Sequence, residues 1–271
     1  MAENAQLKES GDAPVAIITG SATGVGAEVA RALASRGYRV VVNYSRNAQA
    51  AQETAKACLD LGAEVAVVKA DVADDADCRA LVAAAVTRWG RVDVLVNNAA
   101  VTASADFFDL ETMDPADFER ILKVNVVGAF QASRAAMPHL REVGGAIVNV
   151  SSNVALTGGG TSIAYNASKG ALNSMTLALA RVAAPQVRVN AVLPGVIDTD
   201  WMTKVLGAEA FRGVSAASAN ATPLGRIAGP RDVAEVIVWL ATQATFLTGE
   251  LLPVDGGVRL MSRAQQPQAS S

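Results

Sequence analysis

The sequence contains few of the residues that metal sites and disulfide scaffolds require. Its 271 residues include only two cysteines, Cys58 and Cys78, and a single histidine, His139. The two cysteines lack the spacing of metal ligands, and their number is too small for a disulfide framework. We therefore expect neither a bound metal ion nor a fold that depends on disulfides.

A strong charge of either sign is also missing. The 23 Lys and Arg residues and 26 Asp and Glu residues give a formal net charge of −3, so the chain lacks the basic surface that nucleic acids or anionic membranes attract. No apolar run approaches the length needed to span a bilayer. The start of the chain, residues 1–14, is polar and lacks the apolar segment of a signal peptide. These features favour a soluble, cytoplasmic protein with no nucleic-acid or membrane partner.

Short β-branched runs alternate along the chain with alanine-rich segments of helical spacing. Most of the runs are almost continuously apolar, which is typical of strands covered on both faces; they span residues 15–19, 39–43, 65–69, 92–96, 146–150, 187–192 and 251–254. The helical segments span residues 28–35, 50–61, 78–88, 118–140 and 167–182. This alternation predicts an α/β fold: a doubly wound parallel sheet (Rossmann type) of about seven strands, with helices on both faces.

The composition indicates one domain. Hydrophobic residues make up 51% of the chain and charged residues 18%, which is ample for a core. Neither an internal repeat nor a Gly/Ser linker divides the sequence. We expect a single domain over residues 14–260, with flexible tails at 1–13 and 261–271.

Three glycines lie between the first expected strand and the first helical segment. Glycines at such a turn let the backbone approach a pyrophosphate closely, and the free amides and dipole of the helix favour its negative charge. The spacing here is Gly-x3-Gly-x-Gly, which differs from the better-known Gly-x-Gly-x-x-Gly. A tight turn without a ligand is therefore the alternative interpretation. The segment reads Thr19-Gly20-Ser21-Ala22-Thr23-Gly24-Val25-Gly26.

A second set of residues, Ser152, Tyr165 and Lys169, has the composition of a proton-transfer site. Tyr165 and Lys169 are four residues apart near the start of a helical segment, so they lie on one face, one turn apart. A nearby ammonium stabilises a phenolate and lowers the pKa of the phenol from about 10, which makes tyrosine a usable acid or base. Ser152 follows the expected strand 146–150, at the sheet edge where ligands bind. Alone, the Tyr-Lys pair is equally consistent with a surface helix pair.

Further motifs follow in a fixed order, and the ordered set resembles one family. These motifs are Asp71-Val72, Asn97-Asn98-Ala99-Ala100, Asn125, Pro194-Gly195 and Asp255-Gly256-Gly257. Together with the glycine turn and Ser152, Tyr165 and Lys169, they make the chain similar to the short-chain dehydrogenase/reductase family in its compact single-domain form, from about residue 14 to 257. The pattern is most similar to the 3-oxoacyl-(acyl carrier protein) reductases. One departure is Ala100, where the family usually has glycine.

The resemblance implies a role for each polar residue of the site. Tyr165 would be the general acid and base, and Lys169 would lower its pKa and bind the nicotinamide ribose. Ser152, thirteen residues before the tyrosine, would orient the substrate oxygen, whereas Ser151 would have no such role. Asn125 would hold a water molecule in a proton relay. The implied cofactor contacts are Gly20, Thr23, Gly24, Val25, Gly26, Asp71, Val72, Asn98, Ala99, Pro194, Ile197 and Thr199, together with Tyr165 and Lys169.

The end of the second expected strand bears on the choice of cofactor. NAD-specific relatives place a carboxylate about 20 residues beyond the glycines, whereas this chain has Tyr44, Ser45 and Arg46. A serine hydroxyl and an arginine fork suit the 2′-phosphate of NADPH. Thr23, however, stands where many NADPH-dependent relatives have a second basic residue. We expect NADPH/NADP+ to be favoured, with NADH/NAD+ as the alternative and with Arg46 as a solvated loop charge in that case.

The segment 200–227 lies where this family has a substrate lid. Its apolar side chains suit an apolar substrate, although they could equally pack the segment onto its own domain; they are Trp201, Met202, Val205, Leu206 and Phe211. An acyl carrier protein is acidic, so a carrier-protein reductase would need a basic rim. The candidates for that rim are Arg134, Arg141, Lys204 and Arg212.

Three functions remain open on this sequence. The first is an NADPH-dependent reductase of 3-oxoacyl groups or small ketones. The second is an NAD-dependent alcohol, sugar or steroid dehydrogenase, and the third is a nucleotide-sensing module without turnover. The resemblance also implies a homotetramer, in which the helical segments 118–140 and 167–182 pair through small side chains. These side chains are Ala167, Ala171, Ala178 and Ala180.

Overall fold

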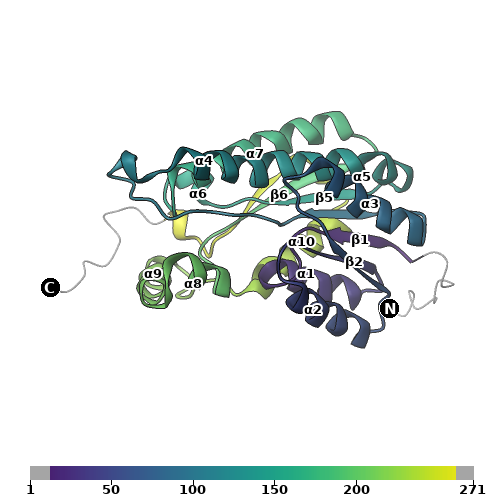
Figure 1. Cartoon of the computed structure of the whole chain (residues 1–271), viewed down its shortest axis with the longest axis horizontal. Coiled ribbons are helices and arrows are strands. Elements are labelled where there is room, and N and C mark those ends of the chain that lie inside the picture. The colour runs from purple at the N-terminus through teal and green to yellow at the C-terminus, as the bar shows by residue number, and fades with distance from the viewer. Residues whose placement is uncertain (1–12, 261–271) are drawn as a thin grey trace.

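A computed structural model describes residues 13–260 and shows one parallel β-sheet between two layers of helices (Figure 1). The tails expected at residues 1–13 and 261–271 lie, apart from residue 13, outside the described residues. The sheet has seven strands in the order β3-β2-β1-β4-β5-β6-β7, and every pair of neighbours is parallel. The prediction of a doubly wound sheet is confirmed. The strands are β1 (Val15–Ile18), β2 (Arg39–Tyr44), β3 (Val65–Lys69), β4 (Val94–Asn97), β5 (Ala146–Val150), β6 (Arg188–Pro194) and β7 (Leu251–Val254).

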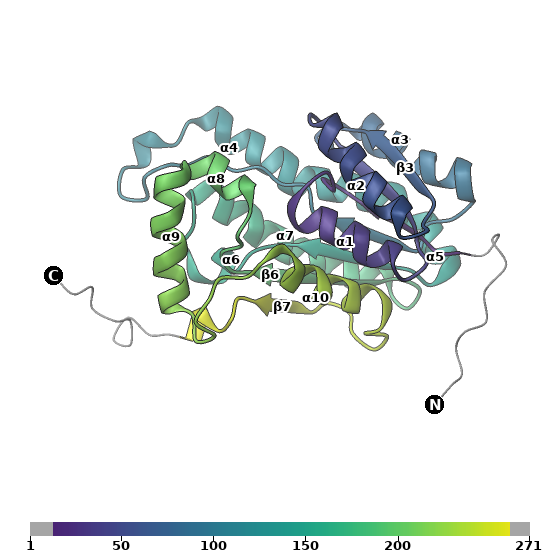
Figure 2. The ribbon, with the colours of Figure 1, turned by 90° about the horizontal axis from the view of Figure 1, so that it is seen from below.

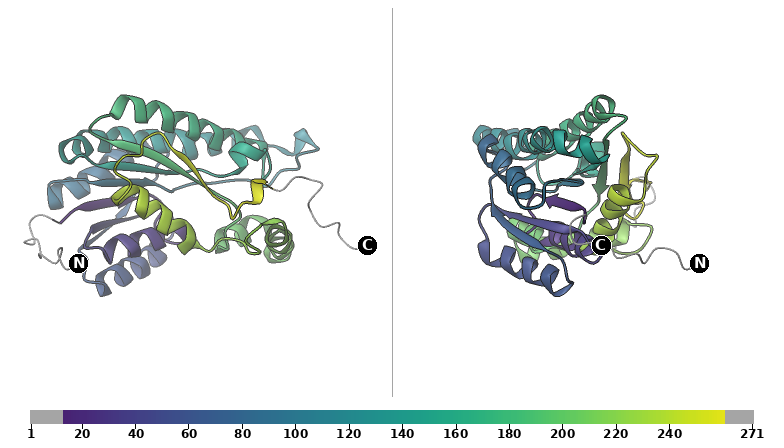
Figure 3. Two further views of the ribbon diagram at one scale, coloured as in Figure 1. Left: turned by 180° about the vertical axis from the view of Figure 1, so that it is seen from behind. Right: turned by 90° about the vertical axis from the view of Figure 1, so that its right-hand side faces the viewer.

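Helices cover both faces of the sheet, and each face has its own hydrophobic core (Figure 3). On one face the strands pack against α1 (Gly24–Ala34), α2 (Ala48–Asp60) and α10 (Pro230–Thr242). On the other face they pack against α3 (Asp75–Trp89), α5 (Ala129–Val143) and α7 (Ile163–Ala183). Because the central strands are buried on both sides, their apolar side chains do not alternate with polar ones.

The helices α4 (Pro115–Leu122), α6 (Val154–Thr157), α8 (Asp200–Leu206) and α9 (Ala208–Ala221) complete the chain. Short 3-10 turns lie at Leu110–Thr112 and Val258–Leu260. Figure 2 shows α8 and α9 at one end of the sheet. No helix within residues 13–260 is long and apolar enough to cross a membrane.

The strand order creates the opening in which a ligand can bind. β1 pairs with β2 on one side and with β4 on the other, so the chain reverses its direction of travel across the sheet between these neighbours. The loops after β1 and β4 therefore leave in opposite directions and open a crevice at the carboxyl ends of the strands. The glycine turn follows β1, and Asn98 and Ala99 follow β4.

The predicted helices differ from the structure mainly in where they begin, and one of them is not a single regular helix. The segment 118–140, predicted as one helix, comprises the end of α4, a π-helical stretch at Lys123–Gly128, and most of α5, which continues to Val143. In a π turn the backbone hydrogen bonds join residues five apart instead of four. This change leaves no strong signal in the sequence, so apolar periodicity does not distinguish a π turn from an α-helix. The first helix begins at Gly24 rather than at residue 28, because two glycines of low helix propensity occupy its first turn.

Candidate active site

The glycine turn after β1 is fixed by packing as well as by backbone conformation. Gly20 and Gly24 have φ values of +61° and +60°, which L side chains rarely adopt. Gly26 has an ordinary φ, but an added Cβ would lie 2.6 Å from Asn98 Nδ2 and 2.7 Å from the Gly20 carbonyl oxygen. Backbone conformation therefore requires glycine at positions 20 and 24, and packing requires it at position 26.

Two asparagines hold the turn in place. The Asn98 side chain donates to the carbonyl oxygens of Thr19 and Gly20, both at 2.9 Å. The Gly20 amide donates to Asn43 Oδ1 at 2.9 Å, while Asn43 Nδ2 donates to the Ala70 carbonyl at 3.0 Å. The sequence motifs indicate Asn98 but not Asn43. The available signal was an amide side chain within the apolar run of β2, because a buried amide needs hydrogen-bond partners.

The first turn of α1 offers free backbone donors at this turn. Thr23 is the N-cap residue, yet its side chain makes no capping hydrogen bond to the helix. A helix start leaves its first amides without intrahelical acceptors, and its dipole favours an anion there. On the outer side of the turn, a Cβ added at Gly24 would meet only Thr199 Cγ2, at 3.8 Å. These features fit a phosphate group, as the sequence predicts.

Ser152 and Tyr165 meet beyond the carboxyl end of β5. Tyr165 lies in the first turn of α7, which begins one residue after Ser162, and the Ser162 hydroxyl accepts a hydrogen bond from the Tyr165 amide at 3.2 Å. The Ser152 side chain lies within hydrogen-bonding reach of the Tyr165 hydroxyl, and the Ser152 hydroxyl donates to the Pro194 carbonyl at 3.4 Å. Ser151 points elsewhere, because its hydroxyl donates to the Lys169 carbonyl at 3.2 Å. The structure thus brings the two expected side chains together and assigns Ser151 to a contact between strand and helix.

Lys169 is buried beside this pair. Only 2% of the residue is exposed, and its ammonium donates to the Val150 carbonyl at 2.8 Å. The same ammonium lies 5.4 Å from the centroid of the Tyr165 ring. Burial disfavours its charged form and lowers the pKa of Lys169 to about 7. The lysine is therefore close to the tyrosine, as the four-residue spacing predicts.

The expectation that the pKa of Tyr165 lies below its ordinary value is wrong for the structure as it stands. Burial raises the pKa of Tyr165 well above its usual value, and the hydrogen bond with Ser152 opposes only part of that rise. The physical reason is desolvation, which penalises the phenolate and also favours neutral Lys169. Tyr165 is therefore held in the protonated form, which is the form that donates a proton.

Asn125 lies in the π-helical stretch and joins it to two neighbours. Its side-chain amide donates to the Val101 carbonyl at 2.9 Å and to the Ser168 hydroxyl at 3.0 Å, and its oxygen accepts from the Val101 amide at 2.8 Å. Ser168 directly precedes Lys169 in α7. Asn125 thus connects the loop after β4 with the helix that carries the tyrosine and lysine. The π turn is what aims this side chain inward, consistent with the frequent placement of such turns at functional sites.

The buried lysine has a measurable consequence for stability. Because the pKa of Lys169 is about 7 in the folded chain and about 10.4 when exposed, the unfolded chain binds the extra proton between these values. Stability therefore rises with pH in that window. From pH 7 to pH 9 we expect the free energy of unfolding of the wild type to rise by about 2 kcal/mol relative to Lys169→Met. Urea unfolding at the two pH values measures this difference.

The matched control for this measurement is the exposed Lys56, whose ammonium pairs with Asp60 on the surface of α2. Lys56→Met should keep the pH slope of the wild type. Parallel pH profiles for the wild type and Lys169→Met would show that Lys169 keeps its charge throughout this range.

The remaining expected cofactor residues lie along the same edge of the sheet. Tyr44 ends β2 and is half-buried, while Ser45 and Arg46 follow it and are exposed. Within residues 13–260 no side chain pairs with Arg46. Asp71 and Val72 follow β3, whereas Pro194 ends β6 and is followed by Ile197 and Thr199. Ala100 needs no glycine, because no non-glycine residue of the described chain has a positive φ.

Two candidates for a basic rim are engaged in contacts between helices. Arg134, on α5, pairs with Asp75 at the start of α3. Arg141, near the end of α5, donates to the Val182 carbonyl near the end of α7. Both guanidinium groups connect helices, so they do not contribute to a rim around Tyr165. Lys204 on α8 and Arg212 on α9 remain in the segment next to the site.

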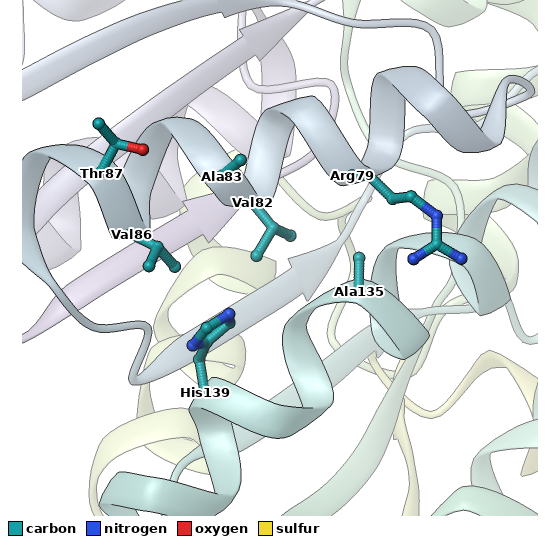
Figure 4. Close-up of a pocket in the computed structure, with 7 residues that line it drawn as sticks. All are labelled: Arg79, Val82, Ala83, Val86, Thr87, Ala135 and His139. Carbon is teal, nitrogen blue, oxygen red and sulfur yellow. The ribbon is translucent and has the colours of Figure 1, made fainter.

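A hollow between α3 and α5 contains none of these residues. Figure 4 shows Ala135 and His139 of α5 facing Val82 and Val86 of α3. The hollow lies on the helical layer, and its lining holds no carboxylate, cysteine or tyrosine. We therefore assign the chemistry to the sheet edge.

The segment expected to be a lid consists of α8 and α9. Phe211 of α9 is buried, whereas Trp201 of α8 is 36% exposed and Leu224 is 71% exposed. The rings of Trp201 and Tyr165 have centroids 6.3 Å apart and are tilted by 46°. Part of the segment therefore packs onto its own domain, and its first turn faces the candidate acid.

Known proteins match this chain over almost its whole length. The family model described as enoyl-(acyl carrier protein) reductase matches residues 20–259. A protein assigned as ketoacyl reductase 2 of the granaticin polyketide synthase, from Streptomyces violaceoruber, is 44% identical over 251 residues, covering 92% of this chain and 98% of the relative. The cis-4-hydroxycyclohexanecarboxylate dehydrogenase of Sinomonas cyclohexanicum is 39% identical over 246 residues, covering 90% and 95%. The crystal structure of a protein assigned as a short-chain dehydrogenase/reductase from Burkholderia xenovorans has a TM-score of 0.86 at 38% identity, covering 94% of this chain and all of that one (100%).

Proposed function

Because this chain belongs to the short-chain dehydrogenase/reductase family, we propose that it is an NADPH-dependent carbonyl reductase in which Tyr165 donates the proton. The observation that carries this proposal is the meeting of Ser152, Tyr165 and Lys169 at the sheet edge that also holds the glycine turn. A nucleotide-sensing module without turnover would not need this proton-transfer set.

The chain fits a dinucleotide at the turn after β1. The uncapped first turn of α1 faces the phosphates with backbone amides, and the glycines leave room for close approach. Asp71 and Val72 would contact the adenine ring, and Asn98 and Ala99 would line the cleft. Ile197 and Thr199 would contact the carboxamide, and Lys169 would bind the ribose hydroxyls. When bound, NADPH supplies the hydride that the carbonyl carbon accepts.

The residues of this chain complete the reaction by transferring a proton to the carbonyl oxygen. The Ser152 hydroxyl orients the carbonyl oxygen, and the Tyr165 hydroxyl donates the proton that converts this oxygen to an alcohol. The high pKa of Tyr165, which is half-buried, keeps the donor protonated at neutral pH. The Lys169 ammonium then stabilises the phenolate that remains. In the oxidative direction the same groups would act in reverse.

The substrate is proposed to be a ketone or a 3-oxoacyl group. The relatives support both directions of the reaction, because one is assigned as a ketoacyl reductase and another is a dehydrogenase of a hydroxycyclohexanecarboxylate. The positions of Arg134 and Arg141 favour a free small molecule over an acyl carrier protein. Incubation with NADPH and a panel of ketones, diketones and acetoacetyl thioesters tests the proposal. Oxidation of alcohols with NAD+ alone would instead favour the NAD-dependent dehydrogenase.

Arg46 is proposed to set the preference for NADPH. It is exposed, follows the end of β2 and lies two residues before α2, so its guanidinium is free to bind a 2′-phosphate near a helix start. A partly exposed contact of this kind contributes about 1.5–3 kcal/mol, or roughly 10- to 150-fold in discrimination. We expect Arg46→Ala to lose about this factor in the ratio of kcat/KM for NADPH to that for NADH.

The control for Arg46 is Arg36→Ala, because Arg36 is an exposed arginine whose guanidinium donates to the Ala32 carbonyl at the end of α1. This variant should keep the cofactor preference of the wild type. Preference of the wild type for NADH, or an unchanged preference in Arg46→Ala, would contradict the assignment.

The proposed assembly is a homotetramer formed through α5 and α7. Phe130 on α5 and Leu177 on α7 are 41% and 48% exposed, so both helices present apolar side chains to solvent. Ala167 and Ala178 are exposed and allow close approach, whereas Ala180 is 4% exposed and packs into the core instead. Light scattering at micromolar concentration measures the assembly, and a monomer would contradict it.

A further inference from the structure

Trp201 is an exposed aromatic side chain next to the candidate acid. Its ring centroid lies 6.3 Å from that of Tyr165, and the planes are tilted by 46°. Tilted and offset aromatic pairs at this separation are attractive. The indole is nevertheless 36% exposed, and within residues 13–260 no hydrogen bond engages its N–H group. One part of the indole packs on Tyr165, and the rest remains free to contact a substrate.

The first turn of α8 spans the opening of the site. Thr199, the N-cap residue of α8, lies at the glycine turn, since its Cγ2 is 3.8 Å from the Cβ position of Gly24. Two residues later, Trp201 contacts Tyr165. The chain therefore runs from the expected phosphate end of the cleft to the reacting hydroxyl. This course places the indole beside the position at which a carbonyl meets Tyr165.

The loop between Ser152 and Tyr165 carries an exposed leucine and three glycines. Leu156 of α6, a helix that begins two residues after Ser152, is 55% exposed. The chain then continues through three glycines toward Tyr165. A Cβ added at Gly158 would meet nothing within 4 Å, and one added at Gly159 would meet only Thr157 Oγ1, at 3.9 Å. Gly158 and Gly159 are therefore open on the surface of this loop, whereas a Cβ added at Gly160 would lie 2.9 Å from Val154 Cγ1.

We infer that Trp201 is a specificity-determining residue that forms an aromatic wall of the substrate site and selects ketones carried on a flat ring system. A ring substrate can stack on the exposed indole face while its carbonyl reaches Ser152 and Tyr165, which an open-chain ketone cannot do. This inference rests on the proposed reductase function, but the stacking of a ring on Trp201 is a binding contact that can be measured without turnover.

The kinetic test compares a ring ketone, 2-tetralone, with an open-chain ketone, ethyl acetoacetate. We expect Trp201→Ala to lose about tenfold or more in kcat/KM for 2-tetralone and to change by no more than about threefold for ethyl acetoacetate. Trp201→Phe, which keeps an aromatic face, should retain most of the preference. Trp239→Ala is the matched control, because Trp239 has a similar exposure of 41% but lies near the end of α10. The neighbouring Leu240 carbonyl accepts a hydrogen bond from Arg188 at the start of β6, which is the end of that strand opposite to Pro194. Equal losses for both ketones, or no loss, would overturn the inference.

A binding measurement separates this inference from the proposed function. Calorimetry with 2-naphthol in the presence of NADP+ measures stacking without turnover. We expect Trp201→Ala to bind 2-naphthol about tenfold or more weakly than the wild type, and Trp239→Ala to bind it equally well. If no ketone is reduced but this difference is found, the reductase proposal fails and the aromatic wall stands. Equal affinity in Trp201→Ala and the wild type would overturn the aromatic wall, whatever the turnover.

Discussion

Tyr165→Phe is expected to lower kcat by about 100-fold or more while leaving the affinity for NADPH within a few-fold of the wild type. The substitution removes only the hydroxyl that is hydrogen-bonded to Ser152. The ring that contacts Trp201 and Lys169 remains, so the site keeps its shape. Steady-state kinetics with a ketone that the wild type reduces gives kcat, and a fluorescence titration gives the affinity for NADPH.

The neighbouring serines provide the internal comparison. Ser152→Ala should also lose most of its turnover, because its hydroxyl meets Tyr165. Ser151→Ala should lose far less, because its hydroxyl bonds to the Lys169 carbonyl and does not face the substrate. Near-wild-type turnover in Tyr165→Phe would remove the proposed mechanism.

Gly26→Ala is expected to distort the phosphate-binding turn and to weaken the binding of NADPH. The added methyl group would lie 2.7 Å from the Gly20 carbonyl oxygen and 2.6 Å from Asn98 Nδ2, so both must move. Asn98 would then lose its bonds to Thr19 and Gly20, which hold the turn. Overpacking of this kind costs about 1–3 kcal/mol of stability. Because the strain falls on the phosphate-binding turn, we also expect the affinity for NADPH to fall by about 10- to 100-fold.

The matched glycine is Gly213 in α9, where an added Cβ would meet nothing within 4 Å. Gly213→Ala should leave the affinity for NADPH unchanged and raise the stability slightly, since alanine is the better helix former. Thermal unfolding and NADPH titration of both variants test the pair. Wild-type affinity in Gly26→Ala would contradict the packing argument.

The sheet could be predicted from the sequence because its strands are buried on both faces. The run at residues 39–43 became β2, Arg39–Tyr44, and the run at residues 146–150 became β5 without change. A strand covered on both sides has a continuous apolar run, which few other structures share. The glycine turn was predicted for a similar reason, since only a few backbone arrangements need three glycines so close together.

The parts that could not be predicted depend on tertiary contacts. The π turn at Lys123–Gly128 is stabilised by contacts such as that of Gly128 with Val72, where an added Cβ would lie 2.8 Å from Cγ2. Residues 128 and 72 are far apart in the sequence, and no local pattern links them. Desolvation of Tyr165 likewise depends on everything packed around it, and it reversed the expected direction of the pKa shift. The four-residue spacing predicted that Lys169 lies beside the Tyr165 ring, but it did not predict how strongly the two groups are desolvated.

The most direct test of the central claim follows a hydride label into the product. Wild-type protein is incubated with NADPH carrying deuterium at C4 on one face or the other, together with 2-tetralone or ethyl acetoacetate, and the alcohol is analysed by mass spectrometry. The reductase account predicts one deuterium on the carbinol carbon from one labelled face, none from the other, and at most a trace of product with Tyr165→Phe. Absence of alcohol across the whole ketone panel, or an alcohol without deuterium from either labelled cofactor, would contradict it.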